Sequence, residues 1–155
     1  LMNNLHLILK RLAEVGFEFV VVGGYAGVLH GSSYVTNDLD ICAVLSPENV
    51  ARLRQALADL NPVHRMTPKK LSFWEVPAEG QTLKNLYLET DGGIVDVLGI
   101  GDFDRLKQNA VEVTLFGQKC RLMSLEDLIA AKEAMGREKD LLMAKELKAI
   151  AAKRQ

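Results

Sequence analysis

Two aspartates, Asp38 and Asp40, stand one residue apart in the segment Asp38-Leu39-Asp40-Ile41. Apolar residues alternate with them, which is the pattern of a β-strand with one buried face. Alternate residues of a strand point the same way, so we expect both carboxylates on one face of a sheet. Because neighbouring carboxylates repel each other, a fold keeps such a pair where a metal ion or a proton neutralises it.

A double glycine, Gly23-Gly24, follows the apolar run Phe17 to Val22 upstream of the aspartates. Glycine lets another molecule approach the backbone closely, and a helix that begins there has free N–H groups that can bind phosphate. The same pair can also serve only as a tight turn between strand and helix. Together with the aspartates, it favours a divalent metal beside a phosphate-bearing ligand.

Asp96 is a third candidate carboxylate. It lies in the apolar run 94–98, which the turn residues Asp91-Gly92-Gly93 mark as the second strand of a hairpin. An aspartate in so apolar a strand costs free energy unless it is paired, hydrogen-bonded or bound to a metal. We expect Asp96 to join Asp38 and Asp40 at one point beside the double glycine.

The elements that must position these residues alternate along the chain. Helical spacing and capping residues predict helices over about 5–15, 25–30, 46–60, 102–109, 124–135 and 137 to the end. Strand patterns and turn residues predict strands over 17–22, 38–44, 83–90, 94–98, 111–116 and 119–122. The order indicates an α+β (α/β) fold with a mixed central sheet flanked by helices. We expect one domain over 1–155, with a catalytic core at about 17–122 and a C-terminal helical segment at 124–155.

The composition argues against several classes of protein. Hydrophobic residues make up 48% of the 155 and charged residues 25%, which is typical of a globular protein with a core of its own. The net charge of −1 argues against a strongly basic nucleic-acid binder, although a local basic patch remains open. Cys42 and Cys120 are far apart and predict reduced core thiols of a cytoplasmic protein. No apolar run is long enough to span a membrane, and we expect no signal peptide.

Two basic stretches each have two interpretations. The segment 61–81 combines basic and aromatic residues: Arg65, Lys69, Lys70, Phe73 and Trp74. It suits a contact with a nucleotide or nucleic acid, or a solvated loop whose Phe73 and Trp74 pack into the core. From Lys132 onward, seven basic residues outnumber four acidic ones. That surplus could face an anion, or it could be a solvated helix face.

The double glycine, the Asp-x-Asp strand and the later strand with one aspartate together resemble the nucleotidyltransferase superfamily built on the DNA polymerase β palm. The residues that carry the resemblance are Val22-Gly23-Gly24, Asp38-Leu39-Asp40-Ile41 and Val95-Asp96-Val97. The C-terminal Lys132-x-Ala134-x-x-Arg137-x-Lys139-Asp140 resembles the helical motif of small bacterial members. Those members include transferases of abortive-infection and toxin–antitoxin loci. The resemblance extends over about 17–142.

The resemblance implies transfer of a nucleoside monophosphate from a nucleoside triphosphate such as ATP to a hydroxyl. The acceptor would be a protein side chain, a tRNA end or a small molecule. The implied cofactor is Mg²⁺ or Mn²⁺, held by Asp38, Asp40 and Asp96. Asp96 would also help to deprotonate the acceptor hydroxyl.

The resemblance also implies how the triphosphate is held. Gly23 and Gly24 would hold it, Lys132 and Arg137 would neutralise its charge, and Ser32 or Ser33 would reach a phosphate. Many relatives carry an arginine two residues before the threonine of the loop that leads to the aspartates. Here that position is Tyr34, so the arginine's phosphate contact would fall to Lys132 or to a basic residue of segment 65–70.

Two other readings compete with the enzyme. One is a binding or regulatory module with weak catalysis, acting with a partner protein as in a toxin–antitoxin pair. The other is an unrelated α/β domain whose aspartates only cap loops. The three carboxylates favour the enzyme, since buried acids without a use are destabilising, whereas Tyr34 favours the module.

Overall fold

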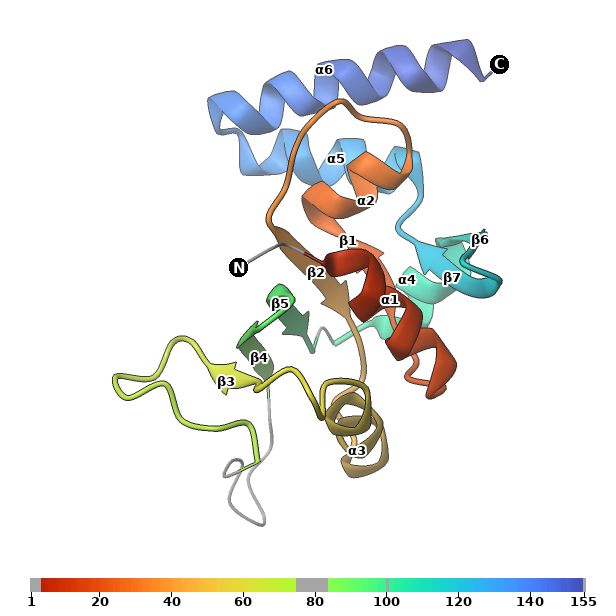
Figure 1. The fold of residues 1–155 in the computed structure, drawn as a ribbon. Helices are drawn as coiled ribbons and strands as arrows, with labels where there is room; N and C mark the ends of the chain where they lie inside the picture. The colour runs from red at the N-terminus through yellow and green to blue at the C-terminus, as the bar shows by residue number, and fades with distance from the viewer. Residues whose placement is uncertain (1–3, 75–83, 100, 155) are drawn as a thin grey trace.

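The computed structural model describes residues 4–74, 84–99 and 101–154. Within these residues, the strands form one seven-stranded sheet in the order β3-β4-β5-β2-β1-β7-β6 (Figure 1). The strands are β1 (Val20–Val22), β2 (Asp38–Cys42), β3 (Val63–His64), β4 (Asn85–Thr90), β5 (Gly93–Leu98), β6 (Val111–Leu115) and β7 (Gln118–Leu122). The sheet is mixed, because β5–β2 and β1–β7 are parallel while the other neighbours are antiparallel. The predicted α+β fold with a mixed sheet is confirmed.

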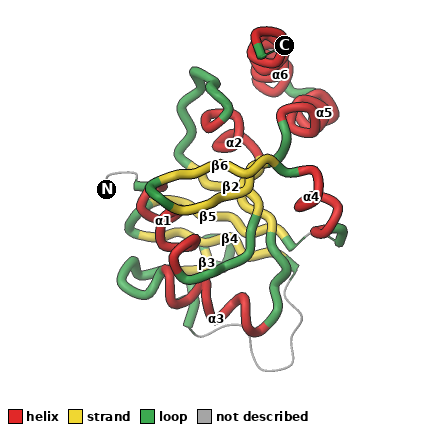
Figure 2. Tube along the Cα trace, turned by 90° about the vertical axis from the view of Figure 1, so that its right-hand side faces the viewer, coloured by secondary structure: helices red, strands yellow, loops and turns green. Residues whose placement is uncertain are grey.

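The helices are α1 (Leu5–Glu14), α2 (Gly23–Leu29), α3 (Pro47–Ala56), α4 (Phe103–Asn109), α5 (Leu125–Met135) and α6 (Glu138–Lys153). Side-chain caps begin three of them: Ser46 for α3, Asp102 for α4 and Ser124 for α5. Gly136, at φ 70°, ends α5 in the left-handed conformation and lets α6 turn back along it. Helices α5 and α6 lie together, far from α3 (Figure 2). No helix among the described residues is long and apolar enough to cross a membrane.

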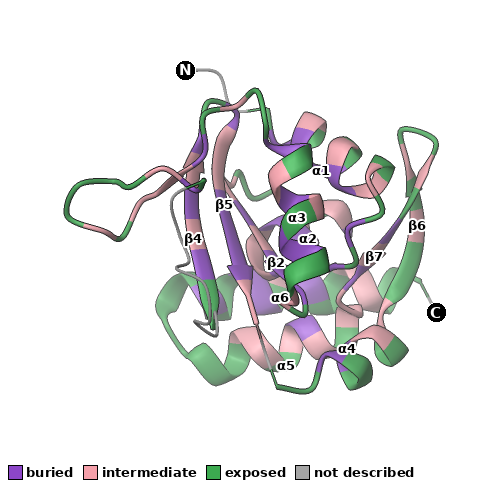
Figure 3. Cartoon of the chain, turned by 90° about the horizontal axis from the view of Figure 1, so that it is seen from below, coloured by how far each residue is buried: buried purple, intermediate pink, exposed green. Residues whose placement is uncertain are grey.

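The two faces of the central strands meet different surroundings. Val21, Leu39, Ile41, Val95 and Val97 are buried in the main core, into which α1 and α3 also pack. Their sequence neighbours point to the opposite face, where Val20, Val22 and Cys42 form a smaller cluster with Phe103 and Leu106 of α4. Figure 3 shows how much of β2, β4 and β5 is buried between these layers. The second face also carries the aspartates. Because successive residues of a strand point to opposite faces, neighbouring residues of β2 and β5 alternate between the core and the site.

Most predicted elements are present, with shifted ends. The predicted strand 17–22 is regular only at Val20–Val22, and the helix predicted from Tyr25 begins at Gly23. Cys42 and Cys120 are buried and unpaired, as predicted. Within segment 61–81, Phe73 is fully buried as expected. The prediction that Trp74 packs into the core is wrong, because its side chain is 47% exposed and stacks on Phe73. Residues 75–81, and residue 83 of the predicted hairpin, lie outside the described residues.

Candidate active site

The strand register lines up two aspartates across the sheet. Asp40 of β2 lies opposite Val22 of β1 on one side and opposite Asp96 of β5 on the other. Paired residues on neighbouring strands project from the same face, about 5 Å apart. Asp38, two residues before Asp40, shares that face. The register therefore places the three predicted carboxylates on one side of the sheet, where Gly23 continues from Val22.

A cavity of about 650 Å³ opens over this face. Its acidic side is formed by Asp38, Asp40 and Asp96, and its glycine side by Gly23 and Gly24. Lys132 of α5, Lys139 and Asp140 of α6, and Arg137 between the two helices also line it. Apolar side chains complete it, among them Leu106, Met123 and Leu128. The volume lies within the range typical of small-ligand pockets.

Asp40 has a carboxylate whose pKa is shifted by its surroundings. Burial, and then the negative charges of Asp96 and Asp38, raise its pKa to about 6, while Lys132 and Arg65 act in the opposite direction. With two other carboxylates beside it, Asp40 has too little positive charge nearby to balance the negative charge of the group. A cation entering the cavity would relieve it.

Gly23 permits Asp40 to come close to the backbone. Its φ is +65°, a conformation that side chains rarely adopt, and a Cβ placed on it would lie 2.7 Å from an Asp40 carboxylate oxygen. Asp40 therefore packs directly over the start of α2. Gly24 is less constrained, because a Cβ there would be 3.7 Å from the Thr36 hydroxyl, an ordinary contact. The first glycine is thus required by the site's geometry.

The basic side of the cavity is organised by Asp140, whose role the sequence did not reveal. Arg137 donates to both carboxylate oxygens of Asp140, at 2.6 and 3.3 Å, and the Lys132 ammonium lies 3.7 Å from it. Asp140 is only 1% exposed, and these cations lower its pKa, with the Arg137 hydrogen bond as the main cause. The Lys132 side chain is 12% exposed, and its charge also acts to lower the pKa of Asp40.

The sequence named Arg65 only as one of several basic residues that suit a nucleotide or phosphate contact, and not as a partner of Asp96. Its guanidinium donates through Nε and Nη2 to the two oxygens of Asp96, at 3.1 and 2.5 Å. The bond to Asp96 is the main cause that raises the pKa of Arg65. The basic character of segment 65–70 was visible in the sequence, but only the β3–β4–β5 pairing brings Arg65 to Asp96.

The fold was compared with known proteins. No family model matches the sequence, and no curated protein matches it. Solved structures do match. The lincomycin-bound lincosamide antibiotic adenylyltransferase LnuA is 17% identical over 96% of this chain and 98% of its own, with a TM-score of 0.64. A candidate nucleotidyltransferase from Thermotoga maritima is 22% identical over 94% and 91%, with a TM-score of 0.54. The antibiotic-resistance factor ANT(2'')-Ia is 15% identical over 97% and 89%, with a TM-score of 0.56.

The protein has the nucleotidyltransferase fold. The family resemblance in the sequence is therefore confirmed at the level of architecture, over nearly the whole chain. The identities are too low to carry more than the fold.

The chemistry of the acidic group fits a hard divalent cation. Carboxylate oxygens are the ligands that Mg²⁺ and Mn²⁺ prefer, and Asp38, Asp40 and Asp96 all line the cavity. Their present arrangement is not that of a complete metal site, since in 4–74, 84–99 and 101–154 no three His, Cys, Asp or Glu side chains converge closely enough for one. In this arrangement Asp96 is paired with Arg65.

The loop between α2 and β2 differs from the sequence expectation. Ser33 does not line the cavity; its hydroxyl donates to Glu146 of α6 at 2.5 Å and its N–H does so at 3.1 Å. Ser32 also donates to Glu146. The two serines thus attach this loop to α6 in place of the expected phosphate contact. Tyr34, at the position of the relatives' arginine, lines the cavity and is 39% exposed.

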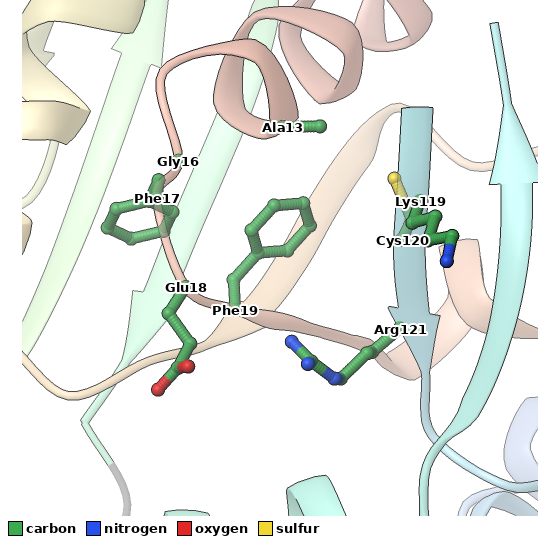
Figure 4. A pocket seen from close by; sticks show the side chains of 8 residues that line it. All are labelled: Ala13, Gly16, Phe17, Glu18, Phe19, Lys119, Cys120 and Arg121. Carbon is green, nitrogen blue, oxygen red and sulfur yellow. The ribbon is translucent and has the colours of Figure 1, made fainter. Parts of the chain in front are cut away.

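A smaller cavity, of about 220 Å³, lies beside the residues that precede β1 (Figure 4). Its lining residues are Ala13, Gly16, Phe17, Glu18, Phe19, Lys119, Cys120 and Arg121. None of the predicted site residues is among them. In the nucleotidyltransferase fold described here, the larger cavity at the other end of β1 is the candidate active site.

Proposed function

We propose that the protein is a metal-dependent nucleotidyltransferase that moves a nucleoside monophosphate from a triphosphate, such as ATP, onto a hydroxyl. The observation that carries the proposal is one cavity lined by Asp38, Asp40 and Asp96 together with Gly23 and Lys132. This chemistry needs carboxylates that hold a metal ion, a backbone that the triphosphate can approach closely, and a basic side chain that binds phosphate.

Each residue would have a separate task. Asp38 and Asp40 would hold Mg²⁺ or Mn²⁺, with Asp96 as the third ligand; a bound metal supplies positive charge to the attacking and leaving oxygens. Asp96 would accept the proton of the acceptor hydroxyl. Gly23 and Gly24 would bind the triphosphate through the backbone at the start of α2.

The basic residues would act on the leaving pyrophosphate. Lys132 would contact it directly, since its side chain lines the cavity and is only 12% exposed. Arg137, half exposed, would follow at the rim. Asp140 would orient both cations. This assignment gives Lys132 the contact that the arginine at the Tyr34 position would make in relatives.

A small hydroxylated molecule is the acceptor that we favour. The chain covers 98% of LnuA and 89% of ANT(2'')-Ia, so a chain of similar length acts on an antibiotic in the first case and serves as an antibiotic-resistance factor in the second. ANT(2'')-Ia was also solved with adenylyl-2''-tobramycin. The apolar part of the cavity would suit the carbon skeleton of such an acceptor.

The second candidate is a module of weak activity that acts with a partner protein, as an antitoxin-like pair would. Tyr34 favours it, because no arginine stands where the relatives have one. Exposed Met135, Leu141 and Leu142 around the α5–α6 turn would suit a protein contact. A tRNA or protein acceptor would accompany this arrangement.

Pyrophosphate release separates the two candidates. It should be measured with each of the four ribonucleoside triphosphates, with Mg²⁺ or Mn²⁺ and with hydroxylated acceptors such as lincosamides and aminoglycosides. We expect metal-dependent release, and a loss of about a thousandfold, equivalent to about 4 kcal/mol, in Asp40→Asn. Asp104→Asn, which removes an exposed carboxylate outside the cavity, should keep full activity. Activity that survives Asp40→Asn would exclude the catalytic assignment.

A further inference from the structure

Arg65 reaches Asp96 from outside the cavity's lining. It follows β3, and its N–H donates to the Tyr87 carbonyl at 3.0 Å, which extends the pairing with β4. Tyr87 lies opposite Asp96 in the sheet. The Arg65 guanidinium lies 5.5 Å from the centre of the Tyr87 ring and continues across it to the carboxylate. The Arg65 side chain thus crosses β4 to meet Asp96 on β5.

The contact uses both ends of the carboxylate. Nε and Nη2 of Arg65 donate to separate Asp96 oxygens, at 3.1 and 2.5 Å. This two-bond geometry is the strongest pairing between a guanidinium and a carboxylate. Since the Asp96 side chain is only 11% exposed, little of it remains open to water. Arg65 therefore acts as the counter-ion of Asp96 in this structure.

A divalent cation needs the same oxygens. Asp40 and Asp96 are direct neighbours in the register, yet among the described residues no three ligand side chains converge as a metal site. If the pair persisted with the cation bound, the guanidinium and the metal would share one carboxylate and repel each other. A carboxylate released from Arg65 could turn toward Asp40.

We propose that Arg65 is an exchangeable counter-ion of Asp96, which leaves the carboxylate when a divalent cation binds between Asp96 and Asp40. This inference rests on the proposed function, since it concerns the same cation. Arg65 is able to leave because its side chain is 27% exposed and its backbone follows a strand of only two residues. Arg65 is thus a positioning residue that sets the affinity of the site for metal.

If Arg65 instead supported Asp96 as a metal ligand, the effect of removing Arg65 on metal affinity would have the opposite sign. Groups that hydrogen-bond a metal ligand from behind strengthen metal binding, and their loss weakens it about 10–100-fold. An exchangeable counter-ion competes with the metal, so its loss strengthens binding. The sign of the change in affinity decides between the two.

The test is Mn²⁺ binding to the full chain without nucleotide, followed by the paramagnetic resonance signal of free Mn²⁺. Arg65→Gln should bind Mn²⁺ more tightly than the wild type by about tenfold, the scale on which neighbours of metal ligands act. The matched control is Lys70→Gln, which removes one positive charge from the same segment, where Lys70 pairs with exposed Glu89. It should change the affinity by less than about twofold.

Unchanged or weaker Mn²⁺ binding by Arg65→Gln would overturn the inference and leave the proposed function standing, provided that Asp40→Asn abolishes binding. If Asp40→Asn binds Mn²⁺ as the wild type does, the acidic face is not the metal site and both proposals are wrong.

Thermal unfolding gives a second measurement. In EDTA, Arg65→Gln should melt below the wild type, because Asp96 loses its partner. Mg²⁺ should raise its melting temperature by more than it raises that of the wild type. Equal increments would contradict the exchange. Should Arg65→Gln fail to fold, Arg65→Lys keeps the charge without the two-bond geometry, and tighter Mn²⁺ binding than wild type is required of it too.

Discussion

Asp40 illustrates how a residue can be suited to a ligand and unfavourable without it. Burial, Asp96 and Asp38 raise its pKa to about 6, above the ordinary value of 3.8. The folded protein therefore holds this proton more tightly than the unfolded chain does. Ionising Asp40 lowers stability as the pH rises through roughly 4 to 6, and the full cost is present at neutral pH.

Asp40→Asn is expected to stabilise the metal-free protein. At pH 7.5 in EDTA, its melting temperature should exceed that of the wild type by about 2–4 °C, because the amide cannot ionise. Below about pH 3 the difference should vanish, since Asp40 is then neutral in both states. Calorimetry across this range measures it. A variant less stable at pH 7.5, or a difference independent of pH, would show that Asp40 is not under electrostatic strain.

Lys132 should be needed for the triphosphate. Lys132→Gln removes the charge of a side chain that is only 12% exposed. Hydrogen bonds to charged groups contribute about 1.5–3 kcal/mol, so we expect nucleotide affinity to fall about 10–100-fold. Lys145→Gln, on the exposed side of α6, is the matched control and should bind normally. Titration with a non-hydrolysable ATP analogue measures both. Equal affinities in the two variants would remove Lys132 from the nucleotide site.

Among single residues, the sequence reveals those that are recognisable from their immediate neighbours in the chain. Asp38 and Asp40 are identified by their own alternation, and Asp96 by its apolar neighbours. The partners of these acids are not local: Arg65 is 31 positions from Asp96. Asp140 was visible only as part of a motif, and its burial between Lys132 and Arg137 depends on how α6 returns along α5.

Among the elements, the turn from β1 into α2 has the strictest requirement. Gly23→Ala should reduce both stability and activity, because a left-handed conformation costs a side chain about 1–2 kcal/mol and the new Cβ would strike the Asp40 carboxylate at 2.7 Å. The measurements are chemical denaturation and the transfer rate.

Two controls separate the causes. Gly117→Ala has a similar positive φ of 75° with nothing within 4 Å of the new Cβ. It should show the backbone cost alone, with full activity. Gly101→Ala, also in open space, should be neutral. If Gly23→Ala and Gly117→Ala had the same stability and the same transfer rate, the close approach of Asp40 to Gly23 would not matter for function.

Element types were predictable from periodicity and caps, and their ends less so. The run Phe17 to Val22 suggests six strand residues, but only Val20–Val22 form a regular strand. All three pair with β2, and Val20 and Val21 also pair with β7. Phe17 and Phe19 are buried by stacking on each other without strand pairing. An apolar run in the sequence indicates that its residues are buried. The length of the strand depends instead on how far the neighbouring strands extend, which the run itself does not show.

For the whole molecule, the sequence indicates a mixed sheet but not its order. The site exists because β2 lies between β1 and β5, which puts Gly23, Asp40 and Asp96 side by side. Hairpin signals predict the β4–β5 and β6–β7 pairs. The parallel β2–β5 pairing joins segments more than fifty residues apart, and nothing in the local pattern specifies it.

The central claim is that this face of the sheet binds a divalent cation together with a triphosphate. Anomalous X-ray scattering from crystals of the full chain, grown with Mn²⁺ and a non-hydrolysable nucleoside triphosphate, tests it most directly. We predict manganese peaks at coordination distance, about 2.1–2.2 Å, from carboxylate oxygens of Asp38 and Asp40, with the triphosphate beside Gly23. A nucleotide bound without manganese at these aspartates, or manganese bound only elsewhere, would contradict the account.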